Sequence, residues 1–137
     1  MIFLDTNVVS EDLRAEPSVA VLDWLERFDV ELALSTVVVA EIAFGIAKIR
    51  PEPRARRLSL GLDEWLHRFR GRVFPLTEEA AFAYGDIMGN ASRQGRAMSV
   101  PDGMIAAVAR VNHGKLATRN ISHFERCGLD LIDPWKQ

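Results

Sequence analysis

Apolar residues along the chain fall into two kinds of segment, short runs and longer stretches with helical spacing. The short runs hold about four residues each, are bounded by polar or turn-forming residues, and are typical of buried strands in a parallel sheet. Four such strands are predicted, together with a possible fifth at the sheet edge. In chain order they are residues 1–4, 31–34, 73–76, 115–118 and 129–132.

Between these runs, apolar residues recur at spacings of three and four, which is typical of a helix with one buried face. Residues 37–49 contain three consecutive valines and are locally compatible with a strand, but the alanine-rich run that follows favours a helix. Proline or a serine or threonine N-cap opens several of the helices. The predicted helices are residues 17–28, 37–49, 54–69, 77–92, 101–111 and 121–127.

Strands that alternate with helices predict a parallel sheet covered on both faces, because each strand must cross over to reach the next. We therefore expect an α/β fold, a three-layer α/β/α sandwich with a central parallel sheet of about four to five strands. All of residues 1–137 are expected to form a single domain. In such sheets, functional groups gather where the carboxyl ends of the strands open into loops.

Composition excludes several classes of protein. Hydrophobic residues make up 48 % and charged residues 26 % of the chain, which is too apolar for a disordered protein. No apolar run reaches the roughly 18 residues of a membrane helix, and no secretory leader precedes Asp5. The single Cys127 excludes an intrachain disulfide and a cysteine-cluster metal site. We expect a cytoplasmic protein that does not enter a membrane.

The formal net charge of -2 conceals an uneven distribution. Residues 1–31 contain eight acids and two bases, a net charge of -6, whereas residues 48–72 contain eight bases and three acids, a net charge of +5. Fourteen of the 17 basic residues are arginine, whose planar guanidinium suits phosphate and carboxylate partners alike. A solvated helix face would show the same pattern, so charge alone does not establish a nucleic-acid partner.

Three acids stand at positions where the pattern predicts strand ends or helix starts. Asp5 directly follows a buried strand, Glu41 interrupts an apolar helix, and Asp102 opens the helix of residues 101–111. Each has an ordinary structural explanation, since Asp5 and Asp102 suit helix N-termini and Glu41 could face solvent or pair with an arginine. All three together are more typical of a carboxylate site for a hard divalent cation.

Four sequence blocks resemble, in order, the motifs of PIN-domain ribonucleases, and above all the VapC-type toxins of bacterial toxin–antitoxin pairs. The resemblance covers the chain from its first residue to Glu125. It implies an α/β/α sandwich, a Mg²⁺ or Mn²⁺ site and endonucleolytic cleavage of RNA by a metal-activated water. The blocks read MIFLDTNVVS, TVVVAEIAFGI, VPDGMIAAVARVNHG and LATRNISHFE.

Carried over position by position, the resemblance implies that Asp5, Glu41 and Asp102 are catalytic metal ligands and that Asn120 is a further metal ligand. It also implies supporting roles for Thr6, Asn7 and Thr118. The fourth block departs from the pattern, because Asn120 occupies one candidate position for an additional acid and His123 stands where many relatives have aspartate. The matching positions therefore leave open whether a fourth carboxylate ligand is present. His123 could be a ligand, a substrate contact or a surface residue.

The resemblance further implies a VapB-type antitoxin, a homodimer, and promoter DNA bound only indirectly, through the antitoxin. The apolar face formed by Leu58, Leu62, Trp65 and Leu66 could receive an antitoxin segment or could be core. An aspartyl-nucleophile phosphatase fits poorly, because Asn7 stands where such enzymes place a second aspartate. The remaining alternative is a catalytically weakened PIN-fold binding or regulatory module that mainly complexes its antitoxin.

Overall fold

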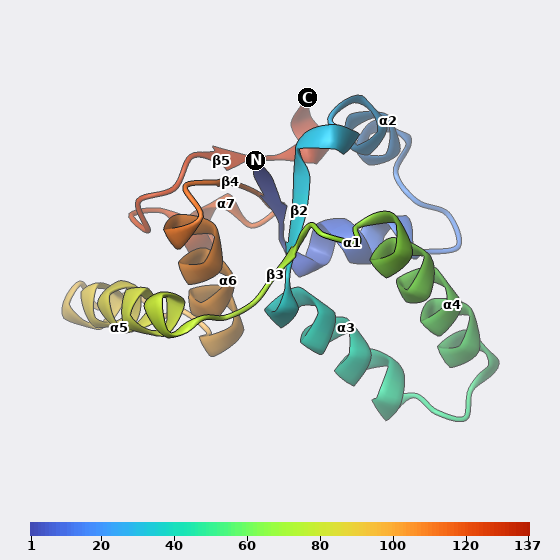
Figure 1. Ribbon diagram of the computed structural model, residues 1–137, viewed down its shortest axis with the longest axis horizontal. Helices are drawn as coiled ribbons and strands as arrows, with labels where there is room; N and C mark the ends of the chain where they lie inside the picture. The colour runs from blue at the N-terminus through green and yellow to red at the C-terminus, as the bar shows by residue number, and fades with distance from the viewer.

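A computed structural model describes all 137 residues and shows five parallel strands surrounded by helices (Figure 1). The strands are β1 (Ile2–Leu4), β2 (Leu32–Ser35), β3 (Val73–Phe74), β4 (Lys115–Ala117) and β5 (Leu131–Ile132). Their order in the sheet is β3-β2-β1-β4-β5, and every neighbouring pair is parallel. The predicted strands, including the edge position of the fifth, are confirmed.

Seven α-helices connect the strands, and six of them lie where the apolar spacing predicts. The helices are α1 (Thr6–Asp12), α2 (Val19–Arg27), α3 (Thr36–Lys48), α4 (Pro53–Arg68), α5 (Glu78–Arg93), α6 (Val100–Val111) and α7 (Ile121–Phe124). Two short 3₁₀ turns, η1 (Asp29–Glu31) and η2 (Pro134–Lys136), complete the chain.

Hydroxyl side chains begin four of these helices, three of them at predicted caps and one at Ser99, in the segment predicted to be a polar loop. Ser18, Ser35, Thr77 and Ser99 each accept a hydrogen bond from the backbone N–H three residues later. Such a cap satisfies one of the N–H groups that a helix leaves free at its first turn. Helix α1 was not predicted, because seven residues are too few to show a helical period.

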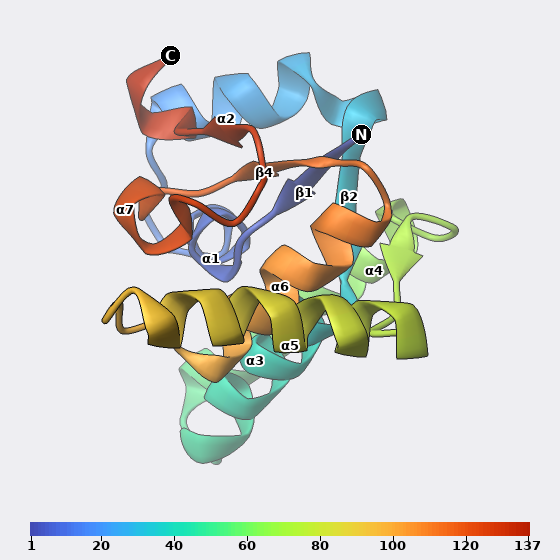
Figure 2. The ribbon, with the colours of Figure 1, turned by 90° about the vertical axis from the view of Figure 1, so that its left-hand side faces the viewer.

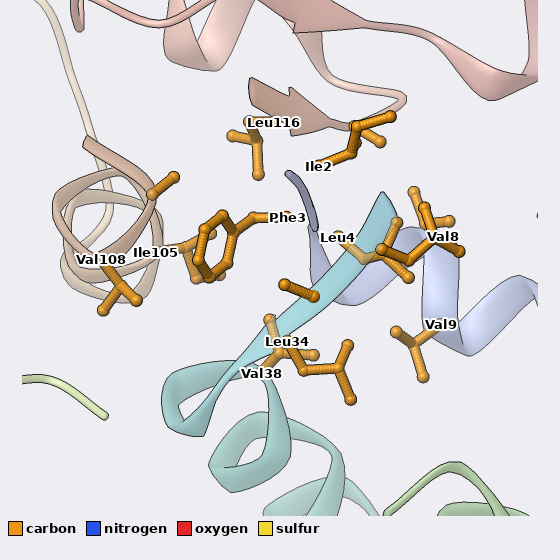
Figure 3. Packing of buried hydrophobic residues seen from close by; sticks show 14 of the residues in the cluster. Ile2, Phe3, Leu4, Val8, Val9, Leu34, Val38, Ile105, Val108 and Leu116 are labelled. Carbon is orange, nitrogen blue, oxygen red and sulfur yellow. The ribbon is translucent and has the colours of Figure 1, made fainter. Parts of the chain in front are cut away.

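The sheet is the middle of three layers, which confirms the predicted fold class. Figure 2 shows α2 and the C-terminal turn on one side of the sheet and α6 with α5 on the other. Helix α6 packs on β2 and β4, and α3 packs on α6 and α4. Figure 3 shows Phe3 of β1 directed toward Ile105 of α6, with Leu34 and Val38 nearby.

The face of α4 that could have received an antitoxin segment belongs largely to the core. Leu62 and Trp65 are buried within the hydrophobic cluster of the molecule, and Leu58 and Leu66 pack partly buried against it. The indole Nε1–H of Trp65 donates to Asp12 Oδ2 at 2.7 Å, which ties α4 to α1. No helix is both long enough and apolar enough to span a membrane.

Candidate active site

Asp5 lies at the carboxyl end of the central strand β1, with only 4 % of its surface exposed. Its backbone N–H donates to the carbonyl of Ala117 at 2.9 Å, which extends the pairing of β1 with β4 by one residue. This pairing places Asp5 beside Thr118, the residue after β4. Because β1 has β2 on one side and β4 on the other, the site lies where the strand order reverses, the usual binding position in such sheets.

Three groups donate hydrogen bonds to the Asp5 side chain. The Thr118 hydroxyl donates to Asp5 Oδ2 at 2.7 Å, and the Asn7 amide donates to the same oxygen at 3.2 Å. The Thr6 backbone N–H donates to Asp5 Oδ1 at 2.8 Å, so Asp5 is also the N-cap of α1. Asn7 in turn accepts from the Arg119 N–H at 3.3 Å. These contacts fix the carboxylate in one orientation.

Glu41 approaches the site from the middle of α3. It is partly buried, and its Oε1 accepts a hydrogen bond of 2.5 Å from the Thr6 hydroxyl. Thr6 therefore connects the two acids, since its backbone N–H binds Asp5 and its side chain binds Glu41. Glu41 therefore contacts Thr6 at the site; it neither faces solvent alone nor pairs with an arginine.

Asp102 lies in the first turn of α6, and its side chain is 20 % exposed. Its Oδ2 is 3.5 Å from Nδ1 of His123, a residue of α7. The His123 side chain is 55 % exposed, so it lies on the surface and also borders the site. Sequence reasoning left its role open among ligand, substrate contact and surface residue.

The three acids lie close enough to influence one another. The pKa of Asp5 is raised from its ordinary value of 3.8 to about 6, chiefly by burial and also by the neighbouring carboxylates Asp102 and Glu41. The hydrogen bonds from Thr118 and Thr6 act in the opposite direction, because they favour the charged form. No Lys or Arg side chain forms an ion pair with Asp5, Glu41 or Asp102, so no such base neutralises their negative charge.

This electrostatic arrangement suits a divalent cation. Carboxylate oxygens are the ligands that Mg²⁺ and Mn²⁺ prefer, and a cation among the three acids would relieve their mutual repulsion. No three Asp, Glu, His or Cys side chains lie close enough together in this structure to hold one metal ion. Water and substrate oxygens would have to complete the coordination, as is usual for Mg²⁺.

Asn120 is exposed, and its contact with the site is through the backbone. Its N–H donates to the Thr118 hydroxyl oxygen at 3.0 Å, which orients the hydroxyl that binds Asp5. No hydrogen bond joins the Asn120 side chain to Asp5, Glu41 or Asp102. Hydrogen bonds therefore bring together Asp5, Thr6, Asn7, Glu41 and Thr118, whereas Asp102 acts on Asp5 through its charge and the Asn120 side chain takes no part in these contacts.

One buried acid beside the site was missed by sequence reasoning. Glu11 of α1 is only 4 % exposed and accepts hydrogen bonds from the Ser18 N–H at 2.8 Å and from Arg14 at 3.1 Å. Burial opposes its charge, but the Ser18 and Arg14 contacts outweigh that effect and lower its pKa. The sequence offered no signal for this, because Glu11 lies among other polar residues in a helix too short to be recognised.

Comparison with known proteins places the chain in a family. A PIN domain matches residues 2–128. The chain belongs to the PIN-domain family. VapC ribonuclease Y4jK of Sinorhizobium fredii is 42 % identical to it over 138 residues, covering 99 % of each chain. Toxin FitB of Neisseria gonorrhoeae is 35 % identical, covering 98 % of this chain and 99 % of its own length.

Solved structures of PIN-domain relatives share the whole fold. The crystal structure of FitAcB from Neisseria gonorrhoeae aligns with a TM-score of 0.91 at 34 % identity and covers all of both chains. VapBC2 from Rickettsia felis, solved with a DNA fragment from its promoter, aligns with a TM-score of 0.82 at 26 % identity and covers 96 % of this chain and 97 % of the other. These matches confirm the resemblance drawn from the four sequence blocks.

Proposed function

We propose that this PIN-domain chain is a metal-dependent endoribonuclease and the toxin of a toxin–antitoxin pair. The observation that carries the proposal is the buried Asp5 carboxylate, held by Thr118, Thr6 and Asn7 within electrostatic reach of Glu41 and Asp102. The names VapC ribonuclease and toxin FitB among its relatives support the same assignment.

In this proposal Asp5, Glu41 and Asp102 hold Mg²⁺ or Mn²⁺. The bound ion would supply an activated water and neutralise charge that develops on the phosphate. Hydrogen bonds from Thr118 and from the Thr6 N–H favour the charged form of Asp5, and the Thr6 hydroxyl holds Glu41 beside it. Asn120 contributes through its backbone contact to Thr118, and its side-chain amide is available to substrate or to a water bound at the ion.

Attack by an external water would leave a 5′-phosphate on one fragment and a 3′-hydroxyl on the other. The carboxylate cluster fits this chemistry, because a divalent ion held by carboxylates would activate a water as the nucleophile. End-group analysis of the cleaved RNA tests the product assignment, and a 2′,3′-cyclic phosphate would contradict it.

Structures of the relatives also suggest a protein partner for this chain. Structures named FitAcB and VapBC2 contain a second protein with the PIN-domain chain, and VapBC2 was solved on promoter DNA. We therefore propose a VapB-type antitoxin for this chain, DNA binding only through that antitoxin, and a homodimer of the PIN domain.

Induction of the protein in cells followed by 5′-end mapping of cellular RNA tests the proposed activity. New 5′ ends should accumulate with the wild-type chain and disappear with Asp5→Asn and with Asp102→Asn. The purified wild-type protein should cleave RNA in Mg²⁺ and lose that activity in EDTA. New ends that persist equally in both variants would come from another nuclease and would reject the proposal. The chain would then fit the alternative of a PIN-fold binding module.

A further inference from the structure

The η2 turn (Pro134–Lys136) contacts the loop that follows β4 through one aromatic side chain. Trp135 is half-buried against the hydrophobic cluster, and its backbone N–H donates to Asp133 Oδ1 at 2.9 Å. The turn also packs on α2, which fixes the position of the ring. The Arg119 guanidinium lies over this ring, with 4.9 Å between its Cζ atom and the ring centre. Trp135 therefore holds the residue that immediately follows Thr118.

This ring is the partner that restrains the Arg119 side chain. Arg119 is exposed, its guanidinium donates no hydrogen bond, and it forms no ion pair with an acid of the chain. A guanidinium over an indole face is attracted by the negative face of the ring. Without Trp135, the side chain of Arg119 would turn freely in solvent and the peptide that carries it would lose a restraint.

The peptide of Arg119 in turn sets the orientation of the Asn7 amide. Its N–H donates to Asn7 Oδ1 at 3.3 Å, and Asn7 Nδ2 donates to Asp5 Oδ2 at 3.2 Å. A side-chain amide carries its acceptor and its donors on opposite ends, so fixing the oxygen directs the NH₂ group at Asp5. The reverse orientation would place the amide oxygen against the carboxylate.

We propose that Trp135 is a positioning residue for the candidate active site. It holds Arg119, Arg119 orients Asn7, and Asn7 supports the Asp5 carboxylate in the orientation that a metal ion requires. The printed contacts form an unbroken series from the ring to the acid. The consequence for metal binding rests on the proposed function, whereas the consequence for the loop does not.

Two other contacts of the same region separate this role from ordinary packing. The Thr118 N–H donates to the Ile132 carbonyl at 2.8 Å, and the Leu116 N–H donates to the Asp130 carbonyl at 3.0 Å. These bonds join β4 to β5 without the ring of Trp135. Loss of the ring contact should therefore release the Arg119 N–H and leave the other two amides protected.

Four variants test the series. Trp135→Leu removes the aromatic face but keeps an apolar side chain, and Trp135→Phe restores an aromatic face. Lys136→Ala changes the exposed neighbouring residue of the same turn. Asn7→Ala removes the acceptor of the Arg119 N–H and the donor to Asp5. The double variant Trp135→Leu/Asn7→Ala completes a cycle, because a residue that acts through Asn7 has no further effect once Asn7 is gone.

The first measurement is the hydrogen exchange rate of the Arg119 backbone amide by NMR, in EDTA. Trp135→Leu should speed this exchange about 5-fold, which corresponds to the loss of one cation–π contact. Trp135→Phe should stay within about 2-fold of the wild-type rate, and Lys136→Ala should match it. Asn7→Ala and the double variant should exchange at one common, faster rate. The amides of Thr118 and Leu116 should keep their wild-type rates throughout.

The second measurement is Mn²⁺ affinity, read from the EPR signal of the free ion. Asn7→Ala should bind about 10-fold more weakly than wild type, and Trp135→Leu about 2- to 5-fold more weakly. The double variant should match Asn7→Ala, and Trp135→Phe should bind nearly as tightly as wild type.

An unchanged Arg119 exchange rate in Trp135→Leu would overturn the inference. Faster exchange at Thr118 and Leu116 as well would also overturn it, because Trp135 would then support β5 in general. A further loss of Mn²⁺ affinity when Trp135→Leu is added to Asn7→Ala would show that Trp135 does not act through Asn7. A wild-type protein that binds no Mn²⁺ would reject the proposed metal-dependent function, while the exchange rates in EDTA would still decide whether Trp135 holds the loop.

Discussion

At the scale of single residues, Asp5 is the centre of the candidate site, because Thr118, Thr6 and Asn7 all donate hydrogen bonds to its carboxylate. Its place after a buried apolar run predicts a carboxylate at the edge of the sheet, together with Glu41 and Asp102. Its partner Thr118 lies 113 residues away and becomes a neighbour only through the pairing of β1 with β4. Strand pairing of this kind depends on the whole fold, so local pattern cannot predict which hydroxyl orients the acid.

Thr118→Val should weaken metal binding without removing a ligand. The substitution deletes the 2.7 Å hydrogen bond that keeps Asp5 charged, so the pKa of Asp5 should rise further and its affinity for Mg²⁺ should fall. Loss of a group that orients a metal ligand typically reduces affinity about 10- to 100-fold. The Mg²⁺ concentration for half-maximal RNA cleavage measures this effect.

Thr118→Ser is the matched control, because it retains the hydroxyl while removing only a methyl group. It should require nearly the same Mg²⁺ concentration as the wild-type protein. If Thr118→Ser and Thr118→Val are shifted equally, packing around residue 118 is responsible and the hydrogen bond to Asp5 is not.

Glu11→Ala should destabilise the fold, although Glu11 is outside the carboxylate cluster. Glu11 is buried, and its removal leaves the half-buried Ser18 N–H without its acceptor, whereas the exposed Arg14 guanidinium can turn to water. Unsatisfied groups of this kind cost about 1–3 kcal/mol. Urea unfolding at pH 7 measures the loss, with the exposed Glu16→Ala as a control expected within about 0.5 kcal/mol of wild type. Equal stability of the two variants would contradict a structural role for Glu11.

At the scale of elements, hydrophobic spacing predicted where each helix or strand lies better than where it begins and ends. The alanine-rich run overruled the three valines of residues 37–49, and α3 is helical from Thr36 to Lys48. Strand β3 is shorter than predicted and ends at Phe74, just before Pro75, because proline has no N–H to continue the ladder. Local composition thus identifies an element, whereas its ends depend on single residues and on tertiary pairing.

Two glycines should respond in opposite ways to substitution by alanine, because one is closely packed against other elements and the other is not. A Cβ on Gly114 would lie 2.7 Å from the buried Phe3 ring and 3.3 Å from the Met1 carbonyl, so Gly114→Ala should cost about 1–3 kcal/mol through overpacking. Gly85 is exposed within α5 with no atom within 4 Å of such a Cβ, so Gly85→Ala should add about 0.5–1 kcal/mol. Thermal or urea unfolding compares them, and destabilisation by both would contradict this difference in contacts.

At the scale of the whole molecule, the fold brings together charged segments that the net charge alone does not distinguish. The acidic first segment and the basic segment of residues 48–72 come together, since α1 and α4 line one groove. The sequence predicted that α4 is amphipathic and rich in arginine. It could not predict that Arg54 and Arg56 line different hollows, because that depends on how α4 packs on α1.

The cost of gathering carboxylates should appear in the pH dependence of stability. The pKa of Asp5 is about 6 in the folded protein and 3.8 is its ordinary value, so the folded state binds more protons than the unfolded state between these pH values. In EDTA the free energy of unfolding should therefore fall as pH rises from about 4 to about 6, by up to about 3 kcal/mol. Asp5→Asn should lack this component.

Comparing wild type with Asp5→Asn by urea unfolding at several pH values isolates Asp5, because Glu11 and every other titrating group is common to both proteins. Mg²⁺ should reverse the effect in the wild type alone, since a ligand that binds only the folded state stabilises it by about 2.7 kcal/mol at 100 times its Kd. Parallel curves for the two proteins in EDTA would show that burial does not penalise the Asp5 carboxylate. Stabilisation of Asp5→Asn by Mg²⁺ to the same extent would place the ion elsewhere.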